Sequence, residues 1–230
     1  MSAELLIESD GGARAEDGVG HKSAALDNAT MMARIADLYF RPGMSIADPM
    51  RGSDVFWKHI DRSLYDLRLT DIKDGVDARM LPYADQSFHA VVLDPPYRYV
   101  EAATSSAGLR MLEGNGYNLE SVRGKGHDAV MGLYRDVMRE GERILMRGGY
   151  MVVKCQDTIT DGKQQWVHSD LMDFARSIGC EPIDLAVVTP AQVPPTRWKI
   201  QRSLRKSHSY FIVCRKGGRW PFGYKSVSAR

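Results

Sequence analysis

The spacing of apolar residues changes period several times along the chain and predicts strands that alternate with helices. Met31, Met32, Ile35 and Leu38 recur at helical spacing, and the turn at 41–43 ends that helix. Short apolar runs bounded by turn residues predict strands, and longer amphipathic runs predict helices. The predicted strands are 44–47, 65–69, 88–94, 148–155, 182–188 and 208–216, and the later predicted helices are 55–60, 128–145 and 169–178.

Strands that alternate with helices indicate an α/β protein with a mainly parallel sheet covered by helices on both faces. We expect one domain over 23–219, preceded by a flexible segment at 1–22 and followed by a tail at 220–230. Two long polar segments, about 98–126 and 191–207, interrupt it. Segments of that length in a compact domain seldom lack a role, so we interpret both as substrate-binding insertions, although plain surface excursions are the alternative.

Composition and charge narrow the choice of partners. Hydrophobic residues make up 43% and charged residues 26% of the 230 residues, as in ordinary globular proteins. The net charge of +2 gives no overall attraction to nucleic acid or membrane, so any basic surface must be local. Cys155, Cys180 and Cys214 lack metal-ligand spacing and are predicted to be reduced core thiols, with no metal site.

No apolar stretch near residue 1 has the length of a secretion signal or membrane span. The expected location is therefore the cytoplasm, or the host cytoplasm for a phage-encoded protein, and no membrane partner is expected.

The stretch 91–97, VVLDPPY, ends an apolar strand in an acid, two prolines and an aromatic ring. The Asp94 carboxylate and the Pro95 carbonyl are acceptors that can hold both hydrogens of an exocyclic amino group. This geometry frees the nitrogen lone pair for attack on an activated methyl group. Proline contributes no competing N–H, and the Tyr97 ring offers a stacking face worth about 1–3 kcal/mol per base. A strand followed by a proline turn is the purely structural alternative.

Three features upstream of this stretch lie, one after another, in the loops after the predicted strands, where ligands of α/β proteins bind. ADPMRGSD, residues 47–54, is a small-residue turn at which backbone N–H groups can approach a ligand. Asp71 follows about 20 residues later, where an acid can accept ribose hydroxyls. Asp77 and Ala78 lie in the next loop, where an acid can accept from an adenine amine. Ordinary turn and capping chemistry explains each feature equally well when it is taken alone.

In this order, the glycine turn, the two acids and DPPY resemble the class I S-adenosylmethionine-dependent methyltransferases over about residues 29–216. DPPY resembles the signature of enzymes that methylate an exocyclic amino nitrogen, typically N6 of adenine in DNA. The resemblance implies a Rossmann-like methyltransferase fold with a seven-stranded sheet, and S-adenosyl-L-methionine as cofactor. It implies cofactor binding by Asp48, Pro49, Met50, Gly52, Ser53, Asp71, Ile72, Asp77 and Ala78, and catalysis by Asp94, Pro95, Pro96 and Tyr97.

Some features depart from that family. The glycine turn usually reads close to DPFxGSG, whereas this chain has Met50 in place of the aromatic and Asp54 in place of the second glycine. No separate target-recognition domain is visible, so sequence selectivity is expected to come from the two insertions, to be modest, or to come from a dimer partner. Both a monomer and a homodimer stay open. VVKCQD and HSYFIVCRK are similar to segments of small bacterial and phage methylases, which favours a stand-alone modification enzyme of the restriction-modification type.

A base inside a duplex cannot reach such a pocket, so the substrate must be flipped out or single-stranded. The two insertions carry clustered cations with interleaved aromatic rings, a pattern suited to phosphate contacts and stacking. A solvated charge run is the alternative. The candidate nucleic-acid-binding residues are Arg98, Arg110, Arg123, Lys125, Arg197, Trp198, Lys199, Arg202, Arg205 and Lys206.

The expected function is therefore methylation of DNA at adenine N6. Cytosine N4 of DNA and an RNA base of tRNA or rRNA are the alternatives, and a non-catalytic nucleic-acid-binding subunit is the alternative outside this class. A nicotinamide dehydrogenase is disfavoured because a G-x-G-x-x-G fingerprint is absent. A protein-glutamine methylase is disfavoured because Asp94 stands where such enzymes typically have asparagine.

Overall fold

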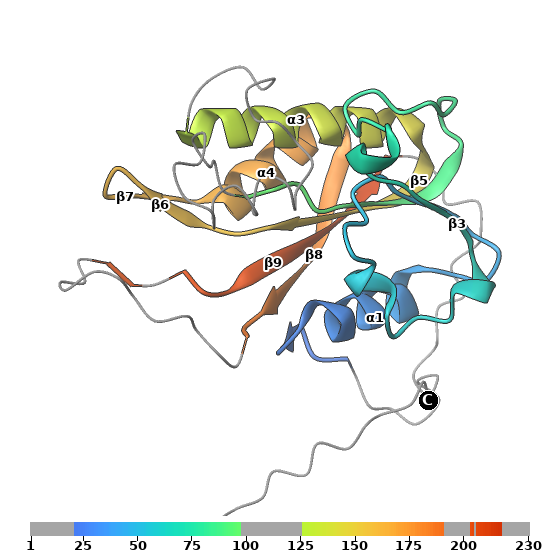
Figure 1. Ribbon diagram of the computed structural model, residues 1–230, viewed down its shortest axis with the longest axis horizontal. Coiled ribbons are helices and arrows are strands. Elements are labelled where there is room, and N and C mark those ends of the chain that lie inside the picture. The colour runs from blue at the N-terminus through green and yellow to red at the C-terminus, as the bar shows by residue number, and fades with distance from the viewer. Residues whose placement is uncertain (1–20, 98–125, 191–202, 205, 218–230) are drawn as a thin grey trace, which may run out of the picture.

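The computed structural model describes residues 21–97, 126–190, 203–204 and 206–217, and its centre is a seven-stranded sheet (Figure 1). The strand order is β1-β8-β9-β5-β4-β2-β3. All neighbouring strands pair in parallel except at β9, which runs antiparallel to both β5 and β8. The strands are β1 Ala24–Ala25, β2 Ser45–Asp48, β3 Asp66–Leu69, β4 Phe88–Leu93, β5 Leu145–Cys155, β8 Cys180–Val188 and β9 Ser209–Lys216.

Helices cover both faces of this sheet, with α1 on one side and α3 and α4 on the other (Figure 1). Alternate residues of each strand point to opposite faces, so Val92 of β4 packs on the α1 side while Val91 and Leu93 pack on the α3 side. The helices are α1 Asn28–Tyr39, α3 Gly126–Ile144 and α4 Val167–Ser177. The predicted Rossmann-like α/β fold, with a mainly parallel seven-stranded sheet, is confirmed.

The elements near the sheet edge are shorter than predicted. The helix expected at 55–60 is a single 3-10 turn, η1 Val55–Trp57. The N–H groups of Trp57 and Lys58 donate to the carbonyl three residues back, as in a 3-10 helix, and not four residues back as in an α-helix. The connection from β3 to β4 contains the 3-10 turn η3 Ile72–Asp74 and no helix or strand of regular length. The remaining short elements are η2 Arg62–Leu64 and the hairpin of β6 Thr158–Thr160 and β7 Lys163–Gln165.

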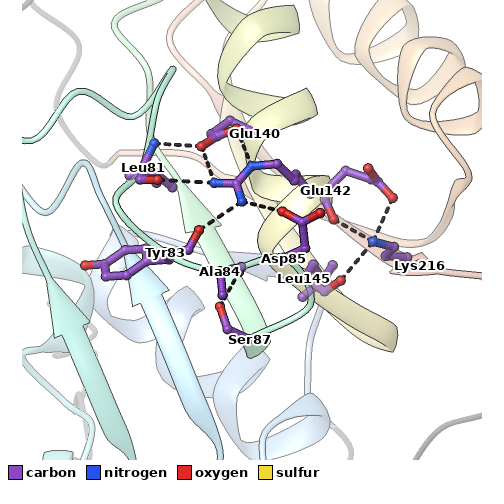
Figure 2. Close-up of polar contacts among 10 residues, drawn as sticks. Leu81, Tyr83, Ala84, Asp85, Ser87, Glu140, Glu142, Leu145 and Lys216 are labelled. Atoms are coloured by element: carbon purple, nitrogen blue, oxygen red, sulfur yellow. Dashed lines mark hydrogen bonds and ion pairs between the residues drawn. The ribbon is translucent and has the colours of Figure 1, made fainter.

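Polar contacts from α3 hold the β3–β4 connection in place (Figure 2). Arg143 donates from Nη2 to the Leu81 carbonyl at 3.2 Å, and from Nη1 to the Tyr83 carbonyl at 2.9 Å and to Asp85 Oδ1 at 2.6 Å. Glu140 accepts from the Leu81 N–H at 2.6 Å and from Arg143 on both carboxylate oxygens. The guanidinium lowers the pKa of Glu140, so the network is ionised at neutral pH. A segment without regular structure is thereby fixed against a helix.

Strands β4 and β5 approach very closely where β5 begins. A Cβ atom placed on Gly149 would lie 2.7 Å from the His89 carbonyl oxygen and 2.8 Å from Leu145 Cδ1. The first of these is backbone and cannot move aside, so glycine is required there for the two strands to pair. This contact sets how far β5 can approach β4.

The three cysteines are buried and free, as predicted. Burial raises the pKa of the Cys180 and Cys214 thiols to about 12, and raises that of Cys155 as well. These thiols are therefore protonated and unreactive at neutral pH. Among the described residues, no helix combines the length and the apolar character that crossing a bilayer requires.

Candidate functional site

Three acids lie at the carboxyl ends of neighbouring parallel strands. Asp48 ends β2, Asp71 follows β3 and Asp94 follows β4. Because β2 lies between β3 and β4 in the sheet, these residues share one edge. Ligands of open α/β sheets bind at that edge. The residues that the sequence predicts to bind the cofactor and to act in catalysis lie on the loops that follow these strands.

Asp48 is buried, with 1% of its surface exposed, and its carboxylate accepts two hydrogen bonds. Trp57 Nε1 donates to Oδ2 at 2.7 Å, and the Met50 N–H donates to Oδ1 at 3.1 Å. Burial raises the pKa of Asp48 to about 7, the two donors oppose this shift, and the nearby Asp94 adds to it. Asp48 thus fixes the start of the glycine turn by accepting from the Met50 N–H, and Pro49 and Met50 are buried next to it.

The glycine turn and the acid after β3 are joined directly. Gly52 adopts a φ of +55° in the left-handed region, and its N–H donates to Asp71 Oδ2 at 3.1 Å. Asp71 Oδ1 accepts from the Lys73 N–H at 3.2 Å and caps the turn that contains Ile72. Ser53 is exposed beside Gly52. This hydrogen bond therefore connects the loop after β2 to the loop after β3, across 19 residues of sequence.

Asp54 occupies the position of the second glycine in the related turns, and it keeps a glycine-like conformation. Its φ is 60° and its ψ is 19°, in the left-handed region that aspartate tolerates better than most residues. Ion pairs with Arg51 at 3.4 Å and Arg62 at 3.2 Å hold the side chain. Asp54 therefore adopts a backbone conformation that glycine reaches without strain.

An unsatisfied hydroxyl lies beside this junction. Thr70 separates β3 from Asp71, and its buried Oγ1 has no hydrogen-bond partner within the described part of the chain. Buried polar atoms are nearly always paired, so this hydroxyl needs an ordered water or another polar group as its partner. Thr70, Gly52 and Asp71 together fit a ligand that carries hydroxyl and amino groups, as S-adenosyl-L-methionine does.

Asp77 and Ala78 are placed in the connection that Arg143 anchors. Ala78 is fully buried, whereas Asp77 is partly exposed and faces its own neighbour. Arg79 donates to both Asp77 oxygens, with its Nη2 at 2.6 Å from Oδ2, and this contact lowers the pKa of Asp77. An adenine amine that binds here has to share oxygens that already accept from a guanidinium.

The acid of DPPY is paired with a buried lysine that the sequence reasoning did not single out. Lys154 Nζ lies 3.3 Å from Asp94 Oδ1 and 3.2 Å from Oδ2, and its side chain is 5% exposed. Asp94 keeps 27% exposure. Burial raises the pKa of Asp94, and the charge of Lys154 and its hydrogen bonds act in the opposite direction. A charged residue within the apolar run MVVKC needs a partner when it is buried. That lysine was therefore the sequence signal from which a buried ion pair could have been predicted.

The remaining DPPY residues lie against α3. Pro95 is buried, and Pro96 and Tyr97 are partly exposed. The buried Tyr134 hydroxyl lies 3.0 Å from the Lys154 carbonyl and 3.4 Å from the Pro95 carbonyl. Since a hydroxyl carries one hydrogen, the shorter contact takes it and the Pro95 oxygen stays available as an acceptor. Tyr134 lies in the helix predicted at 128–145 and was not among the predicted site residues.

The sequence reasoning also missed a polar cluster at the end of β5. Asp157 is 2% exposed and accepts from His168, with 2.8 Å between Oδ1 and Nδ1. The His168 ring stacks on Tyr210 with centroids 4.4 Å apart, and His208 Nε2 lies 2.9 Å from the Tyr210 hydroxyl. These contacts join the N-terminus of α4 to the start of β9, next to the carboxyl end of β5.

Most of the predicted nucleic-acid-binding residues lie outside the described residues. Lys206 is described and partly exposed, and its carbonyl accepts from Gln156 Nε2 at 3.0 Å. This contact ties the end of the second insertion to the carboxyl end of β5. The residues outside the described ranges are Arg98, Arg110, Arg123, Lys125, Arg197, Trp198, Lys199, Arg202 and Arg205.

Comparison with solved structures finds related architectures. A candidate DNA modification methylase of Thermus thermophilus, in complex with S-adenosyl-L-methionine, is 20% identical with a TM-score of 0.42, over 65% of this chain and 57% of that one. TrmN of Thermus thermophilus is 16% identical with a TM-score of 0.46, over 82% and 48%. A 1,6-didemethyltoxoflavin-N1-methyltransferase of Burkholderia thailandensis is 10% identical with a TM-score of 0.48, over 84% and 80%.

This chain thus spans little more than half of the Thermus methylase. At these identities and scores, the likenesses do not extend to substrate or reaction. No protein-family model matches the chain, and no curated protein matches it.

Proposed function

We propose that the protein transfers a methyl group from S-adenosyl-L-methionine to an exocyclic amino group of a DNA base, most favourably N6 of adenine. The observation that carries this proposal is the common sheet edge shared by the Gly52–Asp71 junction and the Asp94–Pro95–Pro96–Tyr97 loop. Methyl transfer requires two bound molecules to lie side by side. The Gly52–Asp71 junction would bind the methyl donor, and the Asp94 carboxylate with the Pro95 carbonyl would bind the amino group at the end of an adjacent strand.

The cofactor side is assigned to Gly52, Asp71 and Thr70, with Asp77 and Ala78 toward the adenine. When bound, S-adenosyl-L-methionine supplies an electrophilic methyl group on a sulfonium. The protein therefore needs to orient the acceptor nitrogen and exclude water rather than to activate the donor. Asp48 holds the start of the glycine turn, because its carboxylate accepts from the Met50 N–H and from Trp57 Nε1.

The acceptor side is assigned to Asp94, Pro95 and Tyr97. An aromatic amine is a poor nucleophile because its lone pair is delocalised into the ring. Hydrogen bonds from both amino hydrogens to Asp94 and to the Pro95 carbonyl favour a tetrahedral nitrogen and return the lone pair to it. As the N–CH3 bond forms, the S–CH3 bond would break and S-adenosyl-L-homocysteine would leave. The extra proton on nitrogen would pass to Asp94 and then to solvent. Tyr97 offers the face on which the extruded base stacks. The cations of the two insertions are proposed to bind the phosphates around that base.

The decisive experiment is methylation of unmodified DNA and RNA with isotopically labelled S-adenosyl-L-methionine, followed by digestion to nucleosides and mass spectrometry. We expect N6-methyladenine from DNA. N4-methylcytosine or a methylated RNA nucleoside would correct the substrate and keep the chemistry. Salt-sensitive binding of DNA without any transfer would refute catalysis and identify a binding subunit.

Asp94→Ala tests the assignment within the site. We expect transfer to fall by about 10²–10³, as for other lost groups that stabilise a transition state, while cofactor affinity by calorimetry stays within about twofold. Asp66→Ala is the control, because Asp66 is an exposed acid of β3, the edge strand beyond β2, and is paired only with Arg68 among the described residues. If the Asp94 variant turned over within a few-fold of wild type, Asp94 would not be the acceptor.

A further inference from the structure

Lys154 is a cation in the middle of an apolar strand. It lies in β5 between Val153 and Cys155, both fully buried, and its own side chain is 5% exposed. Burying an ammonium is costly unless a partner compensates it, so the position of that partner indicates why the charge is there. Among the described residues, the ammonium donates only to Asp94, on both oxygens.

Two aromatic rings complete the surroundings of this ammonium. Nζ lies 5.3 Å from the centroid of the Tyr97 ring and 5.5 Å from that of Phe56. Both distances are within cation–π range. Lys154 thus contacts the acid that would accept the amino hydrogens and the ring on which the base would stack.

A purely structural lysine of the same sheet has a different environment. Lys216 of β9 has a side chain 12% exposed, and it pairs with Glu142, which is 29% exposed. Its Nζ also donates to the Glu142 carbonyl at 2.7 Å and the Leu145 carbonyl at 2.9 Å, which satisfies the end of α3. Lys216 therefore serves backbone groups at the end of α3, whereas within the described part of the chain the Lys154 ammonium contacts Asp94 and the rings of Tyr97 and Phe56.

We propose that Lys154 is a positioning residue of the transfer reaction, one that keeps Asp94 ionised and correctly turned and holds the Tyr97 ring beside it. This inference rests on the proposed function and adds to it a residue that the DPPY motif does not contain. Without Lys154, the Asp94 carboxylate would lose its only cation among the described residues and would take up a proton more readily.

The charges around Asp94 make this loss consequential. Lys154 faces Asp94 from β5, Asp48 faces it from β2 as a second acid, and the Tyr134 hydroxyl and the Cys155 thiol are neutral neighbours from α3 and β5. Burial already raises the pKa of Asp94, and Lys154 is the group that lowers it. A protonated Asp94 accepts amino hydrogens poorly, so transfer should depend on its ionisation.

The test is the pH dependence of single-turnover methyl transfer to DNA by wild type, Lys154→Met and Lys154→Arg. We expect the acid limb of Lys154→Met to move upward by at least about one pH unit, the usual effect of removing a neighbouring cation. At a pH on the acid limb of the wild-type profile, transfer by Lys154→Met should then be about tenfold lower or less, and it should recover at higher pH. Lys154→Arg keeps the charge, so its acid limb should stay near that of wild type.

Lys216→Met is the matched control, since it removes a similarly buried lysine from a comparable ion pair without touching the site. Its acid limb should not move. An unmoved limb in Lys154→Met, with active wild type, would overturn the role of Lys154 and leave the proposed function standing. Lack of transfer by wild type to any nucleic acid would instead overturn the proposed function. If Lys154→Met does not fold, Lys154→Gln, which is also neutral, carries the same comparison.

Discussion

Replacing Trp57 by phenylalanine would test how Asp48 is held under the glycine turn. The substitution removes the indole N–H that lies 2.7 Å from Asp48 Oδ2, while an aromatic ring stays in a site that is 1% exposed. One hydrogen bond to a buried acid is lost, together with part of a buried ring. The two costs differ in their dependence on pH.

The pH-dependent cost follows from the state of Asp48. Its folded pKa of about 7 lies above the unfolded value of about 3.9, so wild type should lose stability as the pH rises from about 4 to about 7 and then level off. At pH 5 the lost hydrogen bond is to a neutral acid and is worth about 0.5–1.5 kcal/mol; at pH 9 it is to a carboxylate and is worth about 1.5–3 kcal/mol. Trp57→Phe should therefore cost about 1–2 kcal/mol more at pH 9 than at pH 5.

Urea unfolding at both pH values measures these differences. Each kcal/mol also corresponds to about 2–4 °C in Tm for a domain of this size. Trp166→Phe is the control, because that indole is 58% exposed and should give small losses at both pH values. In an Asp48→Asn background the extra loss at pH 9 should vanish. An equal loss at pH 5 and pH 9 for Trp57→Phe would refute the assignment of a titrating carboxyl to this hydrogen bond.

Two further substitutions test the packing and the loop that surround the site. Gly149→Ala places a methyl group 2.7 Å from the His89 carbonyl oxygen and should lower the free energy of unfolding by about 1–3 kcal/mol in urea, whereas Gly217→Ala, with its nearest atom at 3.6 Å, should cost less than about 0.5 kcal/mol. Arg143→Leu frees the β3–β4 connection and should weaken S-adenosyl-L-methionine binding in calorimetry about tenfold. The exposed Arg68→Leu should not, and equal affinities for the two arginine variants would show that the Arg143 network does not order the cofactor side.

The sequence predicted the sheet well because its central strands are buried on both faces. Val91 and Val92 pack on opposite sides of β4, so both positions are apolar and the run is unambiguous. β1 was missed because Ala24–Ala25 is too short to show a period. The helix predicted at 55–60 was wrong, since the chain there forms only the 3-10 turn Val55–Trp57, which follows Asp54 in the left-handed region.

The sequence predicted the candidate-site residues that belong to a local motif, and it gave no prediction for contacts that only the fold brings together. Asp71 and Asp94 stand at strand ends that the apolar runs reveal. Lys154 contacts Asp94 across 60 residues, and His168 meets Asp157 only because α4 begins beside the end of β5. Such pairs follow from strand order, and apolar periodicity does not specify strand order.

The antiparallel placement of β9 has a consequence for biosynthesis. β9 fills the gap between β5 and β8, so a nascent chain that has reached Val188 still exposes two unpaired strand edges within its sheet. Both edges carry buried aliphatic residues, which are prone to pair with other chains before the gap is filled. During synthesis the chain is therefore prone to aggregate until Ser209–Lys216 emerges from the ribosome and pairs with both β5 and β8.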